Sequence, residues 1–180
     1  MVVGKRIRPA DHLMDWLETD EARSRSSRAE RLRFLIREFG GAKFRVFYGG
    51  VPALAFEEAR QAYLHGLFVA CTLMCQVCVE QMLGGLLRAS GRNDLEGKNF
   101  QKLLREARDR RLLSTKEFTT FEKLRTWRNP YVHSRPPGGK GTLIRRALNS
   151  NTSPEETAAR DARTAMRTLL RLCQRPPFAY

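Results

Sequence analysis

Residues 52–89 carry the strongest structural signal of the chain, and they read PALAFEEARQAYLHGLFVACTLMCQVCVEQMLGGLLRA. Proline is well tolerated in the first turn of a helix, so Pro52 is a suitable start. Residues 67–79 are apolar around nearly the whole helical circumference, which is typical of a helix in the centre of a bundle. We therefore predict one long central helix over residues 52–89, in an all-α, antiparallel helical bundle.

Amphipathic helices are predicted on both sides of this central helix. Residues 20–39 place apolar side chains at i, i+3, i+4 and i+7, and the helix should end at Gly40–Gly41. These apolar side chains are Leu32, Leu35, Ile36 and Phe39. After the central helix, Asn99 can cap a short helix over residues 100–112.

A Ser-x-x-Glu capping box, formed by Ser114 and Glu117, predicts the start of a further helix. Its apolar side should bury Phe118, Phe121, Leu124 and either Trp127 or the aliphatic stem of Arg125. Pro130 disfavours helical geometry at the residue before it. This helix should therefore end near Asn129.

A second capping box, Ser153 with Glu156, precedes a helix expected to run to about Cys173. One face of that helix is apolar, with Ala158, Ala162, Ala165 and Leu169. The opposite face carries a row of arginines, Arg160, Arg163, Arg167 and Arg171. Two interpretations of the row stay open, a solvated face and a set of phosphate contacts.

These elements divide the chain into three parts. Residues 1–50 are expected to form a helical or irregular extension, residues 51–175 the bundle, and residues 176–180 a short tail. A chain of 180 residues suits one domain with a short appendage, and it can bury a single core without disulfides.

The charge of the chain points to an anionic partner. Thirty-three Lys and Arg against nineteen Asp and Glu give a net charge of +14. A basic surplus of this size favours a polyanion, because each phosphate contact releases condensed counterions. A solvated basic surface and a contact with an acidic protein are the alternatives, and charge does not distinguish RNA from DNA.

The cysteines and the hydropathy pattern indicate a cytoplasmic protein without a membrane segment. Cys71, Cys75 and Cys78 share one apolar helical run and Cys173 lies far away, so buried free thiols are expected. A zinc site would need a further ligand pair, and no metal or other cofactor is expected. Residues 1–15 do not resemble a signal peptide, and the longest uncharged apolar stretch, residues 66–79, is too short to span a bilayer.

Residues 124–133 read LRTWRNPYVH and contain an arginine, a polar residue and a histidine: Arg128, Asn129 and His133. Here the chain resembles the HEPN superfamily, whose signature is Arg, a polar residue and His with four to six residues between Arg and His. The central helix, with Glu80 after small and apolar residues, is similar to the central helix of that family. The resemblance spans about residues 56–174 and implies a HEPN-like bundle that forms a homodimer.

The same spacing also occurs at Arg60 and His65. On a continuous helix, positions i and i+5 point about 140° apart, so Arg60 and His65 should not converge on one ligand. Pro130 should break the helix and allow His133 to fold back beside Arg128. This context favours the motif at residues 128–133.

The resemblance implies metal-independent cleavage of RNA by attack of the ribose 2′-OH, which leaves a cyclic phosphate. His133 would act as general base or acid, Arg128 would hold the scissile phosphate, and Asn129 would orient either group. Glu80 would fix the His133 tautomer or position Arg128. Further RNA contacts are expected from Arg125, Tyr131, Arg135 and Lys140, with Tyr131 stacking on a base or packing in the dimer interface.

The expected partners are RNA, a second copy of the chain, and a neutralising antitoxin or defence-system protein, since a toxin or defence effector is the implied role. Three alternatives stay open. Arg128 and Glu80 can form an ordinary buried ion pair, and His133 can be a capping residue in a turn. The domain can also be a non-catalytic HEPN-like module that binds RNA or a protein. A DNA-binding helix is weakened because no Gly-containing tight turn joins two short helices.

Overall fold

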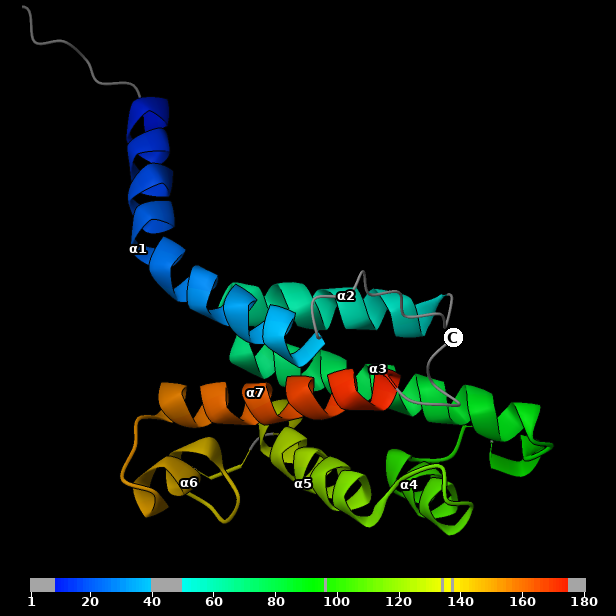
Figure 1. The fold of residues 1–180 in the computed structure, drawn as a ribbon. Helices are drawn as coiled ribbons and strands as arrows, with labels where there is room; N and C mark the ends of the chain where they lie inside the picture. Colours follow the sequence, from blue (N-terminus) through cyan, green and yellow to red (C-terminus); the bar gives the residue numbers. More distant parts are fainter. Residues whose placement is uncertain (1–8, 40–49, 96, 134, 137, 175–180) are drawn as a thin grey trace, which may run out of the picture.

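The computed structural model describes residues 9–39, 50–95, 97–133, 135–136 and 138–174. This part of the chain contains seven α-helices, one short 3₁₀ helix and no β-strand, so the predicted all-α bundle is confirmed. Figure 1 shows the elements in order, which are α1 (Pro9–Phe39), α2 (Val51–Leu64), α3 (Phe68–Ala89), η1 (Asn93–Leu95), α4 (Phe100–Asp109), α5 (Thr115–Val132), α6 (Leu143–Asn149) and α7 (Pro154–Cys173).

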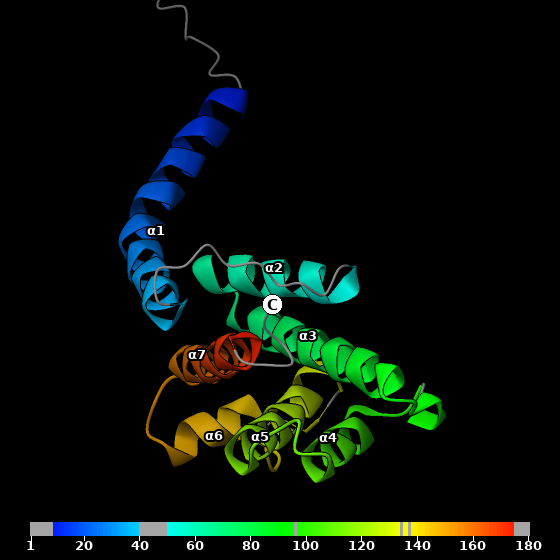
Figure 2. The same ribbon diagram turned by 45° about the vertical axis from the view of Figure 1, so that its right-hand side comes forward.

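Helix α3 lies in the centre of the bundle, with α2 on one side and α4, α5 and α7 on the others (Figures 1 and 2). Its buried side chains, which include Cys75, Val79, Met82 and Leu83, form one broad face of the helix, whereas Ala70 and Gln81 are exposed. Burial of apolar surface stabilises by about 25 cal/mol per Å², so this helix is a main source of folding free energy.

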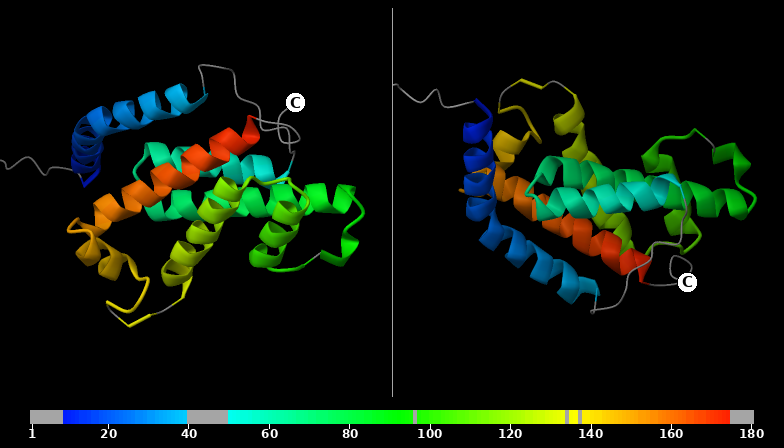
Figure 3. Two further views of the ribbon diagram at one scale, coloured as in Figure 1. Left: turned by 60° about the horizontal axis from the view of Figure 1, so that its bottom comes forward. Right: turned by 90° about the horizontal axis from the view of Figure 1, so that it is seen from above.

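The prediction of one continuous helix over residues 52–89 is wrong. Gly66 adopts φ of +76°, a left-handed conformation that favours glycine, and it separates α2 from α3. The Leu67 N–H donates to the Ala62 carbonyl and the Gly66 N–H to the Tyr63 carbonyl, which closes a Schellman-type turn. Helix α2 therefore folds back and packs along α3 instead of extending it (Figure 3).

The second half of α1 packs on α2 and α7 through the buried side chains of Phe34 and Leu35. Arg31 strengthens this contact, because its Nε donates to the Leu64 carbonyl, 2.8 Å away, at the end of α2. The first half of α1 projects away from the bundle (Figure 1). The helix starts earlier than the predicted residue 20, and the predicted stop at Gly40–Gly41 lies outside the described residues.

Part of the predicted arginine row on α7 has partners within the molecule. The Arg163 and Arg167 guanidiniums lie over the Phe34 ring, at 4.6 and 5.3 Å from its centroid. Arg167 Nε also lies 2.8 Å from a carboxylate oxygen of Glu38. These contacts join α7 to α1, a role that neither interpretation of the row included.

Both predicted capping boxes and the Asn99 cap are present. The prediction that α5 ends near Asn129 is wrong, because the helix continues through Pro130 to Val132. Proline lacks one N–H, and in the last turn that removes a single helical hydrogen bond. The predicted end of the preceding helix at residue 112 is also too late, because Arg111 adopts φ of +59° and α4 ends at Asp109.

Helix α3 is the one described helix long and apolar enough to cross a membrane, by length and composition alone. The uncharged apolar stretch of residues 66–79, which is too short to span a bilayer, is shorter than α3 because the helix continues to Ala89. The core helix of a bundle meets the same criterion, and α3 contacts four other α-helices. All four cysteines are free and buried, and burial raises the pKa of the Cys78 and Cys173 thiols.

Replacing Leu169 with alanine should lower the free energy of unfolding by about 2–5 kcal/mol. The side chain is fully buried in α7, and truncation leaves a cavity in the core. The matched control is Leu148→Ala, because Leu148 on α6 is 69% exposed. Urea unfolding followed by circular dichroism measures both, and equal midpoints for the two variants would contradict this packing.

Candidate functional site

The candidate residues Arg128, Asn129 and His133 lie at the C-terminal end of α5. The capping box fixes the start of this helix, and the buried side chains of Phe121 and Leu124 fix it against the core. Arg128 and Asn129 are partly exposed, and His133 is exposed. These three side chains therefore lie at one accessible end of the bundle.

His133 is the C-cap residue of α5, with extended backbone angles, φ of −121° and ψ of +131°. Its backbone N–H donates to the Asn129 carbonyl over 3.0 Å. The predicted break at Pro130, which was to bring His133 back beside Arg128, is absent. The side chains of Arg128 and His133 form no hydrogen bond with each other among the described residues.

The second match, Arg60 and His65, also ends at a helix C-cap, because His65 is the C-cap residue of α2, but its backbone angles, φ of −85° and ψ of +1°, differ from the extended angles of His133. The two arginines differ in their partners. Arg60 Nε donates to Glu57 over 2.8 Å, whereas no described carboxylate lies within ion-pair distance of Arg128. The two matches therefore differ both in the backbone conformation of the histidine and in the ion pairing of the arginine.

Glu80 of α3 lies within electrostatic range of Arg128 without forming an ion pair with it. Burial raises the pKa of Glu80, while a hydrogen bond from Gln76 and the charge of Arg128 lower it by less. Glu80 lines a cavity of about 160 Å³ between α3, η1 and α4, together with Arg88 and Lys98. The Gln76 Oε1 atom is buried and accepts no hydrogen bond from a described residue.

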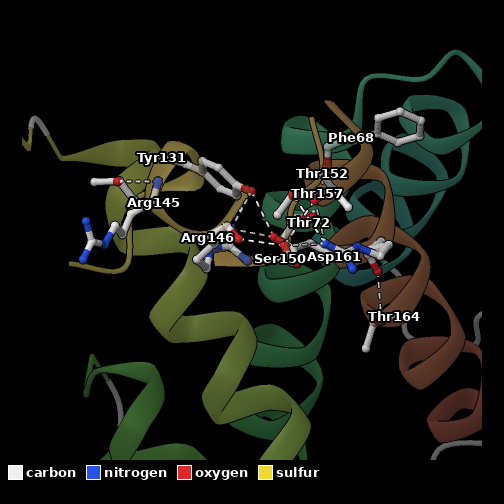
Figure 4. Close-up of polar contacts among 12 residues, drawn as sticks. Phe68, Thr72, Tyr131, Arg145, Arg146, Ser150, Thr152, Thr157, Asp161 and Thr164 are labelled. Carbon is white, nitrogen blue, oxygen red and sulfur yellow. Dashed lines mark hydrogen bonds and ion pairs between the residues drawn. The ribbon is translucent and has the colours of Figure 1, made fainter. Parts of the chain in front are cut away.

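Tyr131 takes part in a buried polar cluster that joins α5, α6 and α7 (Figure 4). Its hydroxyl donates to Asp161 Oδ2 and accepts from Arg146 Nη2, both over 3.1 Å. Arg146 Nη2 lies 2.6 Å from Asp161 Oδ2, and the guanidinium lies over the Trp127 ring at 5.1 Å. Burial and the neighbouring Asp161 raise the pKa of Tyr131 to about 12.

Sequence reasoning missed this cluster. The signal was Asp161, a carboxylate on the apolar face of the predicted helix beside Ala158, Ala162 and Ala165. Asp161 is only 4% exposed, and a buried charge requires a partner. The partner, Arg146, lies on α6, a helix that the sequence analysis did not predict.

The remaining predicted RNA contacts lie around the same end of the molecule. Arg125, one turn before Arg128, is paired with Glu122, with 3.0 Å between Nη2 and Oε2. Arg135 and Lys140 are exposed on the connection between α5 and α6. Of these three basic side chains, the two on the connection have no ion-pair partner among the described residues.

Comparison of the chain with models of known protein families, with curated protein sequences and with solved structures finds no match. Within the described ranges, no group of three or more His, Cys, Asp and Glu side chains is placed to hold a metal ion.

Asp161→Asn should lower the free energy of unfolding by about 3–5 kcal/mol, since it leaves the buried Arg146 charge without its carboxylate. Tyr131→Phe keeps the ring and removes one hydroxyl, so about 1 kcal/mol is expected for that variant. Urea unfolding at neutral pH measures both changes. Equal losses in the two variants would show that the ion pair does not hold the three helices together.

Glu80→Gln should stabilise the fold at neutral pH. The folded state raises the pKa of Glu80 above its ordinary value of 4.5, so folding opposes ionisation of this carboxyl. Wild-type stability should therefore fall as pH rises from 4.5 through the raised pKa, and the variant should not show that loss. Unfolding free energies between pH 3.5 and 8 measure the difference. If the unfolding free energies of wild type and Glu80→Gln differed by the same amount at every pH, the effect of the substitution would be due to packing.

Proposed function

We propose that this chain is a metal-independent endoribonuclease of the HEPN type, with its site at the C-terminal end of α5. The observation that carries the proposal is that the Arg128 guanidinium is accessible and has no ion-pair partner among the described residues. Its side chain is partly exposed, and no described carboxylate neutralises it at contact distance. A guanidinium in that state is available to a phosphate, because its planar fork matches two phosphate oxygens.

His133 supplies the proton transfer in this proposal. An exposed imidazole at the helix end can accept the proton of a ribose 2′-OH or donate one to the leaving 5′-oxygen. The 2′-oxygen then forms a bond to phosphorus as the bond to the 5′-oxygen breaks, which leaves a 2′,3′-cyclic phosphate. Arg128 stabilises the charge that develops on the phosphate oxygens, and Asn129 orients the phosphate.

Glu80 acts through Arg128 in this mechanism. It is half-buried on α3, and its charge and that of Arg128 affect each other. A carboxylate that attracts the guanidinium without forming an ion pair holds it in place and leaves its N–H donors free. Glu80 is therefore proposed as a positioning residue.

The continuation of α5 to Val132, with His133 as its C-cap and no hydrogen bond between His133 and Arg128, supports a composite site. Two copies that face each other at the ends of α5 would place Arg128 of one chain near the histidine of the other. Such a homodimer would also bring together the exposed Arg135 and Lys140 of both chains and line the cleft with cations that attract RNA. We propose a toxin or defence effector in the cytoplasm, whose basic site an acidic antitoxin or partner protein would cover.

A non-catalytic HEPN-like module that binds RNA or a protein is the second candidate. It is favoured by the match at Arg60 and His65, which also lies at a helix end and has an arginine held by Glu57. The Arg-x4-His spacing therefore also arises where the arginine has a structural partner. The involvement of the Tyr131 hydroxyl in the buried cluster with Asp161 points in the same direction.

His133→Ala and Arg128→Ala should each lower cleavage of a mixed RNA pool in EDTA by at least about 100-fold, because each removes a group that acts in the transition state. The matched controls are His65→Ala and Arg60→Ala, which alter the same spacing at the end of α2 and should cleave as the wild type does. Gel analysis measures the rate, and end labelling identifies the cyclic phosphate.

Binding of RNA without cleavage by the wild type, in EDTA or with added metal ions, would favour the non-catalytic module. Equal loss in the control variants would mean that the cleavage does not depend on the end of α5. Circular dichroism of all four variants separates loss of activity from loss of folding.

A further inference from the structure

The first half of α1 carries large apolar side chains that nothing in the described bundle covers. We define the arm as residues 12–22, all of which are exposed. Its large apolar side chains, Leu13, Met14, Trp16 and Leu17, are between 48% and 64% exposed. They recur one helical turn apart, and Figure 1 shows that this part of α1 projects from the other helices. Contiguous apolar exposure of this kind marks an interaction surface.

The charge of the arm is opposite to that of the rest of the chain. It contains four acidic residues, Asp15, Glu18, Asp20 and Glu21, and no lysine or arginine. The whole chain carries a net charge of +14. An acidic helix is repelled by nucleic acid and by anionic lipid, so its partner is a surface that is basic and partly apolar.

A groove that is basic and partly apolar lies beside the second half of the same helix. It has a volume of about 550 Å³ and lies between α1 and α7. We define the arginine groove by its lining residues, which are Glu30, Arg33, Ile36, Arg37 and Arg163. Three of the five are arginines, and the Ile36 side chain is 52% exposed.

The arm and the arginine groove are complementary in charge and in exposed apolar surface. The apolar side chains of the arm match the exposed Ile36, and its carboxylates match Arg33, Arg37 and Arg163. Arginine also binds the face of a tryptophan ring, which suits Trp16. Tryptophan and arginine are the residues that most often dominate the free energy of a protein interface.

The arm cannot reach the arginine groove of its own chain. Both belong to one helix, Pro9–Phe39, and Trp16 and Arg33 are about 25 Å apart along an unbroken helix, since each residue advances about 1.5 Å. The groove that the arm can enter is therefore that of another molecule, and a second copy of this chain provides one.

We infer that the arm of each chain docks in the arginine groove of a second copy, and that the second arm docks reciprocally. The contact is the same on both chains, so it closes into a twofold dimer and leaves no arm free. The inference rests on the charges and exposure of α1 and does not require the ribonuclease activity. This contact involves α1 and α7, and it is separate from the contact at the ends of α5 that is proposed above for the RNA site.

A charge exchange tests this inference. The arm variant carries Asp15→Arg and Glu18→Arg, and the groove variant carries Arg33→Glu and Arg37→Glu. All four side chains are exposed, and none has an ion-pair or side-chain hydrogen-bond partner among the described residues. Each variant alone brings like charges together, so its self-association should weaken at least about tenfold relative to the wild type. Sedimentation velocity over a concentration series measures the dissociation constant.

The two variants should associate when they are mixed in equal amounts. The reversed arm then meets the reversed groove, and the unchanged arm meets the unchanged groove, so both contacts are attractive. Recovery of the wild-type dissociation constant only in the mixture supports the docking of arm in groove. A wild-type chain that stays monomeric, reversed variants that dimerise as the wild type does, or a mixture that stays monomeric would each overturn the inference.

Apolar variants provide a test that leaves the charge unchanged. Leu13→Ser with Trp16→Ser should weaken the wild-type dimer at least about tenfold, because these side chains are the anchors of the arm. The matched control is Ile144→Ser with Leu148→Ser, which changes two exposed apolar side chains on α6. An equal effect of the two pairs would assign self-association to general surface hydrophobicity and would overturn the inference.

Discussion

Helix α3 buries nine of its 22 residues, and a helix this apolar is stable in water only when other helices cover its buried face. Helices α2, α4, α5 and α7 provide that cover. The turn at Gly66 makes the arrangement possible, because it lets α2 fold back along α3. If residues 52–89 formed one helix, the apolar side of α2, with Phe56, Ala59 and Tyr63, would lie beyond the core instead of packing on α3.

The position of the candidate site follows from two buried contacts of α5. Leu124 packs in the core, and Arg128 lies one helical turn later on the same side, which brings it within electrostatic range of Glu80 on α3. Asp161 and Arg146 hold the Tyr131 hydroxyl, which fixes the last turn against α6 and α7. Asn129 and His133 are left at the surface between these fixed points. The end of α5 is thus rigid on its inner side and open on its outer side.

The sequence predicted the features that depend on local patterns. The capping boxes at Ser114 and Ser153, the cap at Asn99 and the apolar core of α3 follow from neighbouring residues alone. Features that depend on long-range contacts were missed. Gly84 and Gly85 remain helical inside α3, whereas the single Gly66 ends α2, because only there does folding back bury apolar surface. Pro130 is likewise tolerated because Tyr131 is held by Asp161 on a distant helix.

The charge of the chain shows why net charge alone does not define its contacts. Glu38 binds Arg167 and Asp161 binds Arg146, so part of the basic surplus stabilises the bundle itself. At physiological ionic strength, exposed charges more than about 8 Å apart are largely screened. Two copies with a net charge of +14 therefore repel each other mainly at short range, where the local pattern decides the sign of the interaction. An acidic arm on a basic body reverses that sign locally, which favours the docking of the arm over non-specific contact between two basic surfaces.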